Sequence, residues 1–306
     1  MTPDVVVLDG GFATILDGGF ATELERRGHD LSDDLWSARL LRDDPDEVIA
    51  THLAFYQAGA DVATTASYQA SVEGFARHGV SAVEVEGLLR DSVRLARIAA
   101  SLAEAQDGVR RLVAASVGPY GAVLADGSEY TGDYGVDDAF LRDFHRRRTA
   151  VLADAGADLL AVETIPSEQE VAVLLAVLEE LAPSTPAWLS VTCADDRRTR
   201  SGDDAARVFG LAASSDQVVA VGVNCTAPEH VTALVQRAVA ASGKPAVAYP
   251  NSGEGWDAEA RAWSGPGAVV DGALAQRWVG AGARYVGGCC RVGSGDIAGL
   301  VATLRG

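Results

Sequence analysis

AGADLLAVETIPSEQEVAVLLAVLEEL, residues 155–181, contains one complete strand-and-helix unit. Its stretch 158–166 is almost continuously apolar, as is typical of a parallel strand that is covered on both faces. Ser167 follows as a candidate helix N-cap, and Glu170 stands three residues later, where it can reach back in a capping box. The segment therefore predicts a βα unit whose helix begins directly after its strand.

The same unit recurs along the chain. The fragment Ala-Gly-Ala stands before three strand candidates, at 58–60, 155–157 and 281–283, where glycine can end a helix and start the turn into a strand. Pro45 and Pro228 mark the first turns of two further helices. The strand candidates lie at 5–11, 61–67, 111–119, 158–166, 186–193, 220–226, 245–252 and 283–290. Their alternation with helices predicts an α/β chain with parallel strands.

The absence of a Gly/Ser/Pro-rich linker between the units favours one closed barrel over two domains. We expect a (β/α)8 TIM barrel that spans residues 1–306 as a single domain. An open dinucleotide-binding sheet would need G-x-G-x-x-G after the first strand, and neither Gly10-Gly11-Phe12 nor Gly18-Gly19-Phe20 fits that pattern.

The charge of the chain is strongly negative. Its 306 residues include 25 Lys and Arg against 43 Asp and Glu, a net charge of −18 at pH 7. Such a surface repels phosphate backbones, so we expect small-molecule partners and no nucleic acid. No apolar run is long enough to cross a membrane, and the first residues carry an acidic side chain where a signal peptide is basic. These features predict a cytoplasmic protein without membrane contact.

An eight-residue duplication lies near the start. LDGGFATI (8–15) is followed at once by LDGGFATE (16–23), so that either copy can end the first strand. Because eight is even, both alignments keep the same side chains on the same face of the strand. The second copy is favoured, since residues 14–19 then form the strand and the loop at the barrel mouth keeps its length. The run Val5–Val7 then lies elsewhere.

Three of the four cysteines stand at predicted strand ends. Cys225 ends the sixth strand, and Cys289 and Cys290 end the eighth, so their sulfurs converge on one face of a barrel. Three thiolates around a tetrahedral zinc ion leave one position open, which is the pattern of catalytic zinc sites. The glycines at 287 and 288 let the backbone approach such an ion closely. We interpret Cys193, at the end of the fifth strand, as a non-ligand.

With these residues in place, the chain resembles the homocysteine S-methyltransferase family of zinc-dependent barrels. Within that family, it is most similar to the enzymes that use S-methylmethionine. The matching motifs are LDGGFATELERRG (16–28), TTASYQAS (64–71), SVGPYGA (116–122), SEYTGDY (128–134), AVETIPS (161–167), GVNCTAP (222–228), YPNSGEGWD (249–257) and GGCC (287–290). The duplication leaves the family's first-strand aspartate assigned to either Asp9 or Asp17.

The resemblance implies a function. Zinc would be held by Cys225, Cys289 and Cys290, and the homocysteine thiolate would take a methyl group from S-methylmethionine or S-adenosylmethionine to give methionine. The residues implied to bind homocysteine are Asp17 or Asp9, Gly18, Thr64, Thr65, Glu163 and Asn224. For Asn224, a second interpretation is a hydrogen bond to a ligating sulfur, and a third is a plain strand cap.

Two alternative functions and one question about aromatic residues stay open at this point. One is a relative that uses betaine, a corrinoid-bound methyl group or a selenol acceptor, and another is a zinc-binding or redox-sensing barrel impaired by the duplication. The question concerns Tyr68, Tyr120, Tyr130 and Tyr134. Their aromatic faces either attract an onium methyl donor or pack against other residues of the loops that carry them.

Overall fold

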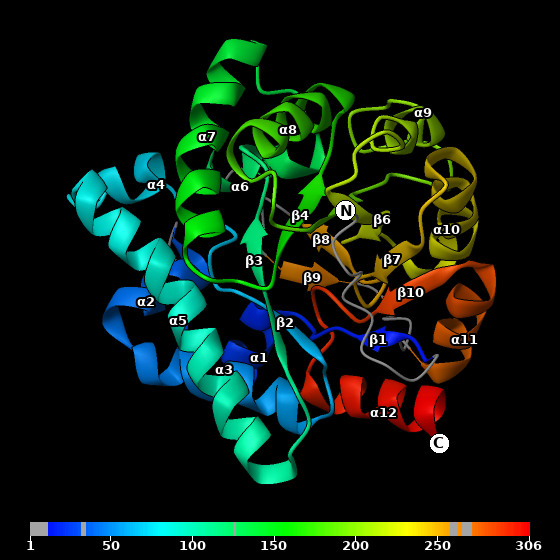
Figure 1. Cartoon of the computed structure of the whole chain (residues 1–306), viewed down its shortest axis with the longest axis horizontal. Coiled ribbons are helices and arrows are strands. Elements are labelled where there is room, and N and C mark those ends of the chain that lie inside the picture. The colour runs from blue at the N-terminus through cyan, green and yellow to red at the C-terminus, as the bar shows by residue number, and fades with distance from the viewer. Residues whose placement is uncertain (1–11, 32–34, 125–126, 258–261, 265–270) are drawn as a thin grey trace.

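The computed structural model describes residues 12–31, 35–124, 127–257, 262–264 and 271–306. Within these residues, the central sheet has eight parallel strands in the order β1-β10-β7-β6-β5-β4-β3-β2. A parallel bridge between Leu16 and Val62 joins the two end strands. The sheet therefore closes into the expected (β/α)8 barrel, which Figure 1 shows inside a ring of helices.

The strands of the barrel are β1 (Thr14–Ile15), β2 (Val62–Thr64), β3 (Leu112–Val117), β4 (Leu159–Ile165), β5 (Ala187–Val191), β6 (Val218–Asn224), β7 (Ala246–Tyr249) and β10 (Ala283–Val286). The helices are α1 (Phe20–Arg26), α2 (Leu40–Asp43), α3 (Pro45–Gln57), α4 (Val72–Ala76), α5 (Ala82–Asp107), α6 (Gly121–Leu124), α7 (Asp138–Asp154), α8 (Glu168–Leu181), α9 (Ala205–Gly210), α10 (Pro228–Ser242), α11 (Gly272–Ala281) and α12 (Ser294–Arg305), with two 3-10 turns, η1 (Trp36–Arg39) and η2 (Ser128–Tyr130).

Alternation along each strand explains the continuous apolar runs. On β4, Leu159 and Ala161 belong to the cluster that fills the barrel, whereas Leu160 and Val162 belong to the core between strands and helices. Both kinds of position are buried, so the strands need apolar residues on both faces. Trp188 and Tyr285 are the largest fully buried side chains of the barrel interior.

The second copy of the duplicated octapeptide forms the end of the first strand. Thr14 and Ile15, the last residues of the first copy, pair with β10, and the Ile15 amide donates to Asp61 Oδ2 at 2.7 Å. The second copy continues the strand, because the Leu16 amide donates to the Val286 carbonyl at 2.8 Å and the Asp17 amide donates to the Val62 carbonyl at 3.0 Å. Asp61 also binds Arg305 of α12, so the start and the end of the barrel meet at one carboxylate. The favoured alignment of the sequence is thus confirmed, whereas the strand candidate 5–11, the run Val5–Val7 and Asp9 lie outside the described residues.

One local expectation was only partly right, and one local element was not foreseen. Ser167 caps α8 as predicted, because its hydroxyl accepts a bond from the Glu170 amide at 3.2 Å. The Glu170 carboxylate does not complete the box; it is fully buried and binds the Tyr120 amide, the Tyr134 hydroxyl and the His145 ring. A short antiparallel pair, β8 (Gly255–Asp257) and β9 (Ala262–Ser264), follows β7 and was not expected.

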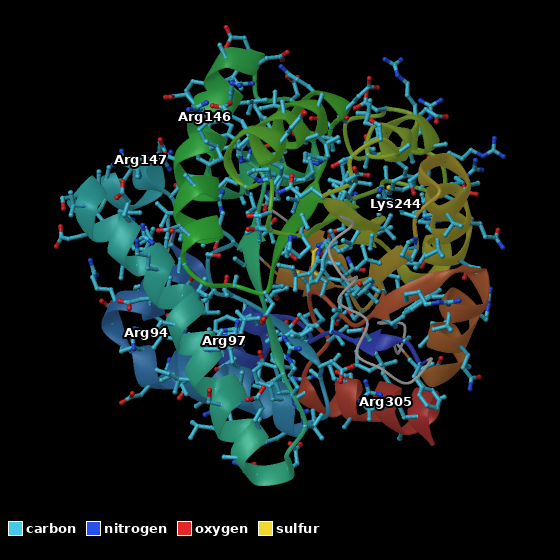
Figure 2. The ribbon with its side chains drawn as sticks, in the orientation of Figure 1. Arg94, Arg97, Arg146, Arg147, Lys244 and Arg305 are labelled. Carbon is cyan, nitrogen blue, oxygen red and sulfur yellow. A yellow bond between two sulfur atoms is a disulfide. The ribbon has the colours of Figure 1, made fainter. Side chains whose placement is uncertain are left out.

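The six basic residues labelled in Figure 2 come from α5, α7, the turn after α10 and α12, and lie in different parts of the view. Each of the six has a partner: Arg94 with Asp91, Arg97 with Asp158, Arg146 with Glu180, Arg147 with Glu86, Arg305 with Asp61, and Lys244 with the Ser215 carbonyl. Among the helices of the described residues, none is both long enough and apolar enough to cross a membrane.

Candidate metal and substrate site

A pocket lies at the carboxyl-terminal ends of the barrel strands, where barrel enzymes carry their chemistry. Its lining takes in every site residue that the sequence predicted within the described part of the chain. The described lining residues are Asp17, Gly18, Gly19, Phe20, Ala21, Thr22, Ser37, Thr64, Thr65, Ala66, Tyr68, Gln69, Glu129, Glu163, Thr164, Asn224, Cys225, Tyr249, Gly288, Cys289 and Cys290. This set contains three carboxylates and three cysteines, but no Lys, Arg or His.

The three predicted cysteines meet on one side of this pocket. The sulfurs of Cys225, Cys289 and Cys290 all lie within 4.8 Å of one another. Cys225 and Cys289 are joined as a disulfide, and Cys290 Sγ lies 3.7 Å from Cys225 Sγ. Burial, and after it the charge of Glu129, raises the pKa of the Cys290 thiol to about 12. The sequence analysis predicted the cluster but not the disulfide, and Cys193 lies outside the group, as predicted.

The backbone around the site is strained. Three residues other than glycine have positive φ angles in the described chain: Thr164 at 61°, Cys225 at 46° and Arg291 at 67°. Thr164 directly follows Glu163, Arg291 directly follows Cys290, and Cys225 is itself a site residue. A positive φ is unfavourable for a β-branched residue such as threonine, and strain of this kind is concentrated at functional sites.

The Asn224 side chain holds the strained turn in place. Its Oδ1 accepts from the Thr164 amide and the Ser190 hydroxyl, both at 2.8 Å, and its Nδ2 donates to Thr164 Oγ1 at 2.7 Å. The same Nδ2 lies 3.9 Å from Cys289 Sγ. This geometry agrees with the predicted hydrogen bond to a candidate ligand sulfur. Asn224 also binds residues of two other strands, so it does more than cap its own strand.

Two buried carboxylates face the pocket, Asp17 just after β1 and Glu163 on β4. Asp17 accepts bonds from the Thr64 amide at 2.8 Å and from the Thr64 hydroxyl, and Glu163 accepts from the Ser116 hydroxyl and, at 3.0 Å, from Tyr249. Burial raises the pKa of Asp17 well above its usual range. Burial also raises the pKa of Glu163 to about 7, although its hydrogen bonds oppose the increase. The pocket thus favours a cationic ligand, which would restore the charged form of both groups.

The glycines at the strand ends serve close packing of the barrel. A side chain at Gly18 would lie 2.3 Å from the Val292 carbonyl, and one at Gly287 would lie 2.7 Å from the Asp17 carbonyl. A side chain at Gly288 would lie 2.1 Å from Val292 Cγ1. Gly287 therefore lets β10 approach the end of β1, and Gly288 makes room for the Val292 side chain in the turn after β10. These contacts are a packing reason for both glycines, beside the predicted approach to an ion.

The predicted tyrosine group divides. Tyr68 lines the pocket, whereas Tyr120 packs edge-to-face against Tyr134, Phe140 and Phe144. Tyr134 donates to the buried Glu170. Packing of the loop, rather than contact with a donor, is thus the role of Tyr120 and Tyr134, and the side chain of Tyr130 lies outside the described part.

Sequence reasoning missed several residues of the pocket. Ser116 and Tyr249 both bind Glu163, and Glu129 enters the pocket from η2. The sequence did point to them, because all three belong to motifs that carried the family resemblance. Ser116 and Tyr249 also lie within the last two residues of strands β3 and β7. Their partners, however, lie on other strands, and spacing along the chain does not show such pairs.

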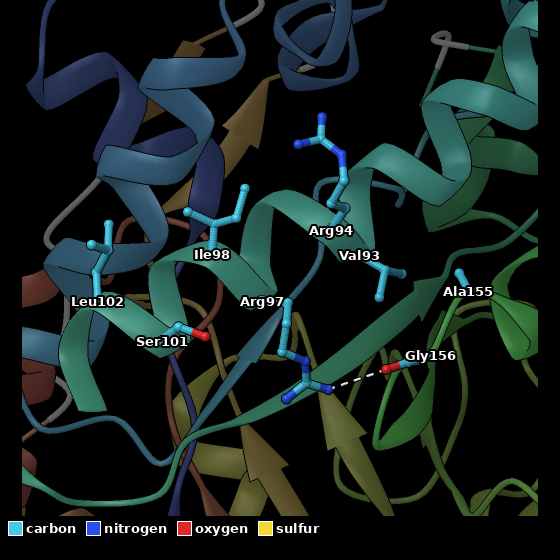
Figure 3. A pocket seen from close by; sticks show the side chains of 8 residues that line it. All are labelled: Val93, Arg94, Arg97, Ile98, Ser101, Leu102, Ala155 and Gly156. Atoms are coloured by element: carbon cyan, nitrogen blue, oxygen red, sulfur yellow. Dashed lines mark hydrogen bonds between the residues drawn. The ribbon is translucent and has the colours of Figure 1, made fainter. Parts of the chain in front are cut away.

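A second depression lies on the outside of the barrel, between α5 and the turn that precedes β4 (Figure 3). Its two cations are already engaged: Arg97 binds the Gly156 carbonyl and Asp158, and Arg94 binds Asp91. Its lining includes the hydroxyl of Ser101 but no Cys, His, Asp or Glu that could activate it or bind a metal. The cluster of sulfurs and carboxylates among the described residues lies at the mouth of the barrel.

The chain is similar to characterised methyltransferases over nearly its whole length. The sequence model of the family described as homocysteine S-methyltransferase matches residues 14–304. Identity to the homocysteine S-methyltransferase of Escherichia coli (strain K12) is 46% over 304 residues, covering 98% of this chain and 95% of that protein. Identity to the selenocysteine Se-methyltransferase of Brassica oleracea var. italica is 43% over 305 residues, covering 95% of this chain and 86% of that protein.

Solved structures agree with the sequence comparison. The homocysteine methyltransferase MmuM from Escherichia coli in its metallated form superposes with a TM-score of 0.87 at 43% identity, covering 96% of this chain and 97% of that one. The oxidized form of the same protein also has a TM-score of 0.87, at 42% identity, covering 97% of this chain and 98% of that one. The chain therefore belongs to the homocysteine S-methyltransferase family, whose members are methyltransferases with a TIM-barrel fold.

Proposed function

We propose that this protein transfers a methyl group from a sulfonium donor, S-methylmethionine or S-adenosylmethionine, to homocysteine, with zinc held by Cys225, Cys289 and Cys290. The observation that carries the proposal is the meeting of three sulfurs and two buried carboxylates in one pocket. The sulfurs suit a zinc ion, and the carboxylates suit the ammonium group of an amino acid.

The cysteines fit the proposed metal. Zinc binds thiolate sulfur at about 2.3 Å in tetrahedral geometry, which places neighbouring sulfurs about 3.8 Å apart. Cys225 and Cys290 already have their sulfurs at 3.7 Å. The disulfide between Cys225 and Cys289 must be reduced before these thiols can bind a metal, so we propose a reducing compartment, the cytoplasm, as the place of activity. Bound zinc would keep the homocysteine thiol in its nucleophilic, deprotonated form.

The carboxylates define the binding mode of homocysteine. We assign its ammonium group to Asp17 and Glu163, because an isolated pair of buried carboxylates is unfavourable without a cation. Its carboxylate is assigned to the turn after β2, with Thr64, Thr65 and the neighbouring amides. Gly18 would contribute by letting the turn after Asp17 pack against the Val292 carbonyl, which holds Asp17 at the pocket.

The transfer needs no general acid. The homocysteine sulfur attacks the methyl carbon, the new S–C bond forms as the S–C bond of the sulfonium breaks, and the bonding electrons return to the donor sulfur. The homocysteine thiolate loses its charge and becomes methionine, while the cationic donor becomes a neutral thioether. A described pocket lining with three carboxylates and no basic residue supports a cationic donor.

Two broader proposals follow. The net charge of −18 and the paired basic side chains support small molecules, rather than nucleic acid, as partners. The match over residues 14–304 supports the proposal that the barrel is the single homocysteine-binding domain of residues 1–306.

The direct test is methionine formation from homocysteine under reducing conditions. S-methylmethionine, S-adenosylmethionine and betaine are compared as donors for the wild type, for Cys289→Ala and for the control Cys193→Ala. We expect turnover with a sulfonium donor in the wild type and in the control, and none in Cys289→Ala. Turnover with betaine alone, or full activity of Cys289→Ala, would refute the proposal.

A further inference from the structure

A buried arginine outside the pocket ties together two turns of the pocket wall. Arg148 of α7 is 2% exposed and is not among the lining residues. Its Nη1 donates to the Gly118 carbonyl at 3.2 Å, and its Nη2 donates to the carbonyls of Ser67 and Tyr68 at 3.0 and 2.9 Å. One guanidinium therefore fixes the turn after β2 and the turn after β3.

From these carbonyls, hydrogen bonds continue into the pocket. The Ser67 hydroxyl donates to the Ser116 carbonyl at 2.8 Å and lies 2.7 Å from Thr65 Oγ1. Thr65 Oγ1 accepts the Ser116 amide at 3.1 Å, and the Ser116 hydroxyl donates to Glu163. A continuous path thus joins Arg148 to the carboxylate that we assign to the substrate ammonium group.

The surroundings of Arg148 suit a cation that holds main-chain groups. Its guanidinium lies over the Phe144 ring at 5.4 Å, and the negative charges of Glu170, Glu73 and Glu163 act on it. Burial lowers the pKa of Arg148 to about 10, so it keeps its charge at neutral pH. A planar guanidinium presents its donors in a fixed fork, whereas the single ammonium of lysine cannot reach three carbonyls with the same geometry.

We propose that Arg148 is a positioning residue for homocysteine, which fixes residues 64–69 and Glu163 in the geometry that binds the amino acid. This inference rests on the proposed function. It assigns no contact between Arg148 and the substrate, and it leaves the sulfur cluster on β6 and β10 unaffected. Loss of the fork should therefore weaken homocysteine binding without loss of the metal.

The experiment compares Arg148→Lys with Arg111→Lys in the zinc-loaded enzyme. Arg111 is a matched control, since it is also buried, at 5% exposure, but binds Asp107 and the Val109 carbonyl at the start of β3, the opposite end of the barrel. We expect Arg148→Lys to raise the KM for homocysteine about tenfold, as a misplaced turn does, and to leave zinc content, kcat and the KM for the donor within about twofold. Arg111→Lys should leave all four values unchanged.

A second measurement does not depend on turnover. Amide hydrogen exchange of residues 64–69 should become faster in Arg148→Lys than in Arg111→Lys, because three carbonyl contacts of the turns are weakened. Equal exchange in both variants, or an unchanged KM for homocysteine in Arg148→Lys, would overturn the inference while the proposed function stands. If the wild type itself fails to bind homocysteine, the proposed function fails, and the exchange comparison still decides whether Arg148 holds the turns.

Discussion

Replacement of Glu163 by glutamine should make the ligand-free protein more stable and much less active. Glu163 is 7% exposed, and among the described residues its side chain accepts hydrogen bonds from Ser116 and Tyr249 and has no ion-pair partner in direct contact. Glutamine has the same shape and keeps the acceptor for Ser116, but it carries no charge to desolvate. The substitution therefore isolates the energetic consequence of one buried carboxylate.

The magnitude follows from the shift in protonation. Burial raises the pKa of Glu163 from 4.5 to about 7, so the folded protein holds the proton more tightly than the unfolded chain between these values. Stability is then highest below pH 4.5 and falls as the pH rises through 7, the sign for a carboxyl with a raised pKa. At about 1.4 kcal/mol for each pKa unit, ionised Glu163 costs the fold at most about 3.5 kcal/mol. For a chain of this length, that corresponds to about 5 °C in Tm.

The assay is denaturant unfolding of wild type and Glu163→Gln from pH 4.5 to 8.5, in reductant and chelator so that metal loss does not vary with pH. We expect equal stability at pH 4.5, and a variant that is more stable by about 1–3 kcal/mol at pH 8. Exposed Glu179 of α8, changed to glutamine, controls for removal of one negative charge. A variant less stable than the wild type at pH 8, or with undiminished affinity for homocysteine, would refute this reasoning.

Three further predictions follow from the site and the first strand. Asn224→Ala leaves the Thr164 amide without its buried acceptor, so we expect the free energy of unfolding to fall by about 1–3 kcal/mol, as measured by urea titration. The same variant should keep its zinc but have a lower kcat, as checked by metal analysis and turnover. Removal of the metal with a chelator in reductant should abolish turnover but leave the far-ultraviolet circular dichroism unchanged, because the large apolar clusters that hold the strands and helices together need no metal. Zinc should restore activity, and unfolding on chelation would contradict this. Deletion of residues 8–15 joins Val7 to Leu16 and brings Val6 and Val7 to the positions of Thr14 and Ile15 in β1. Because the removed length is even, the side chains keep their facing, and kcat/KM should stay within about twofold of the wild type; a large loss would show that the first copy is needed.

Much of the fold is predictable from local sequence, because each βα unit carries its own strand, cap and turn. Pro45 and Pro228 begin helices as expected, and each of the seven later strand candidates contains or overlaps a strand. The first strand was ambiguous for a physical reason, since a duplication of even length preserves the facing of every side chain. Contacts between the two ends of the chain, through Asp61 and Arg305, are absent from any local pattern.

The site is predictable to the extent that it lies at strand ends. Cys225, Cys289 and Cys290 could be placed together because parallel strands of a barrel end on one face. Glu170 shows the limit: its spacing from Ser167 indicated a capping box, but partners from α7 and the loop after β3 take both carboxylate oxygens. Burial of that kind is a tertiary effect, and a local signal cannot compete with it.

The central claim is that three cysteines hold a zinc ion on which methyl transfer depends. Its most direct test is the zinc content of protein purified under reducing conditions, for the wild type and for alanine variants of Cys193, Cys225, Cys289 and Cys290. The account predicts stoichiometric zinc in the wild type and in Cys193→Ala, and a loss of zinc in each of the other three. A reduced wild type that binds no zinc, or a variant of Cys225, Cys289 or Cys290 that keeps its full zinc content, would contradict the account.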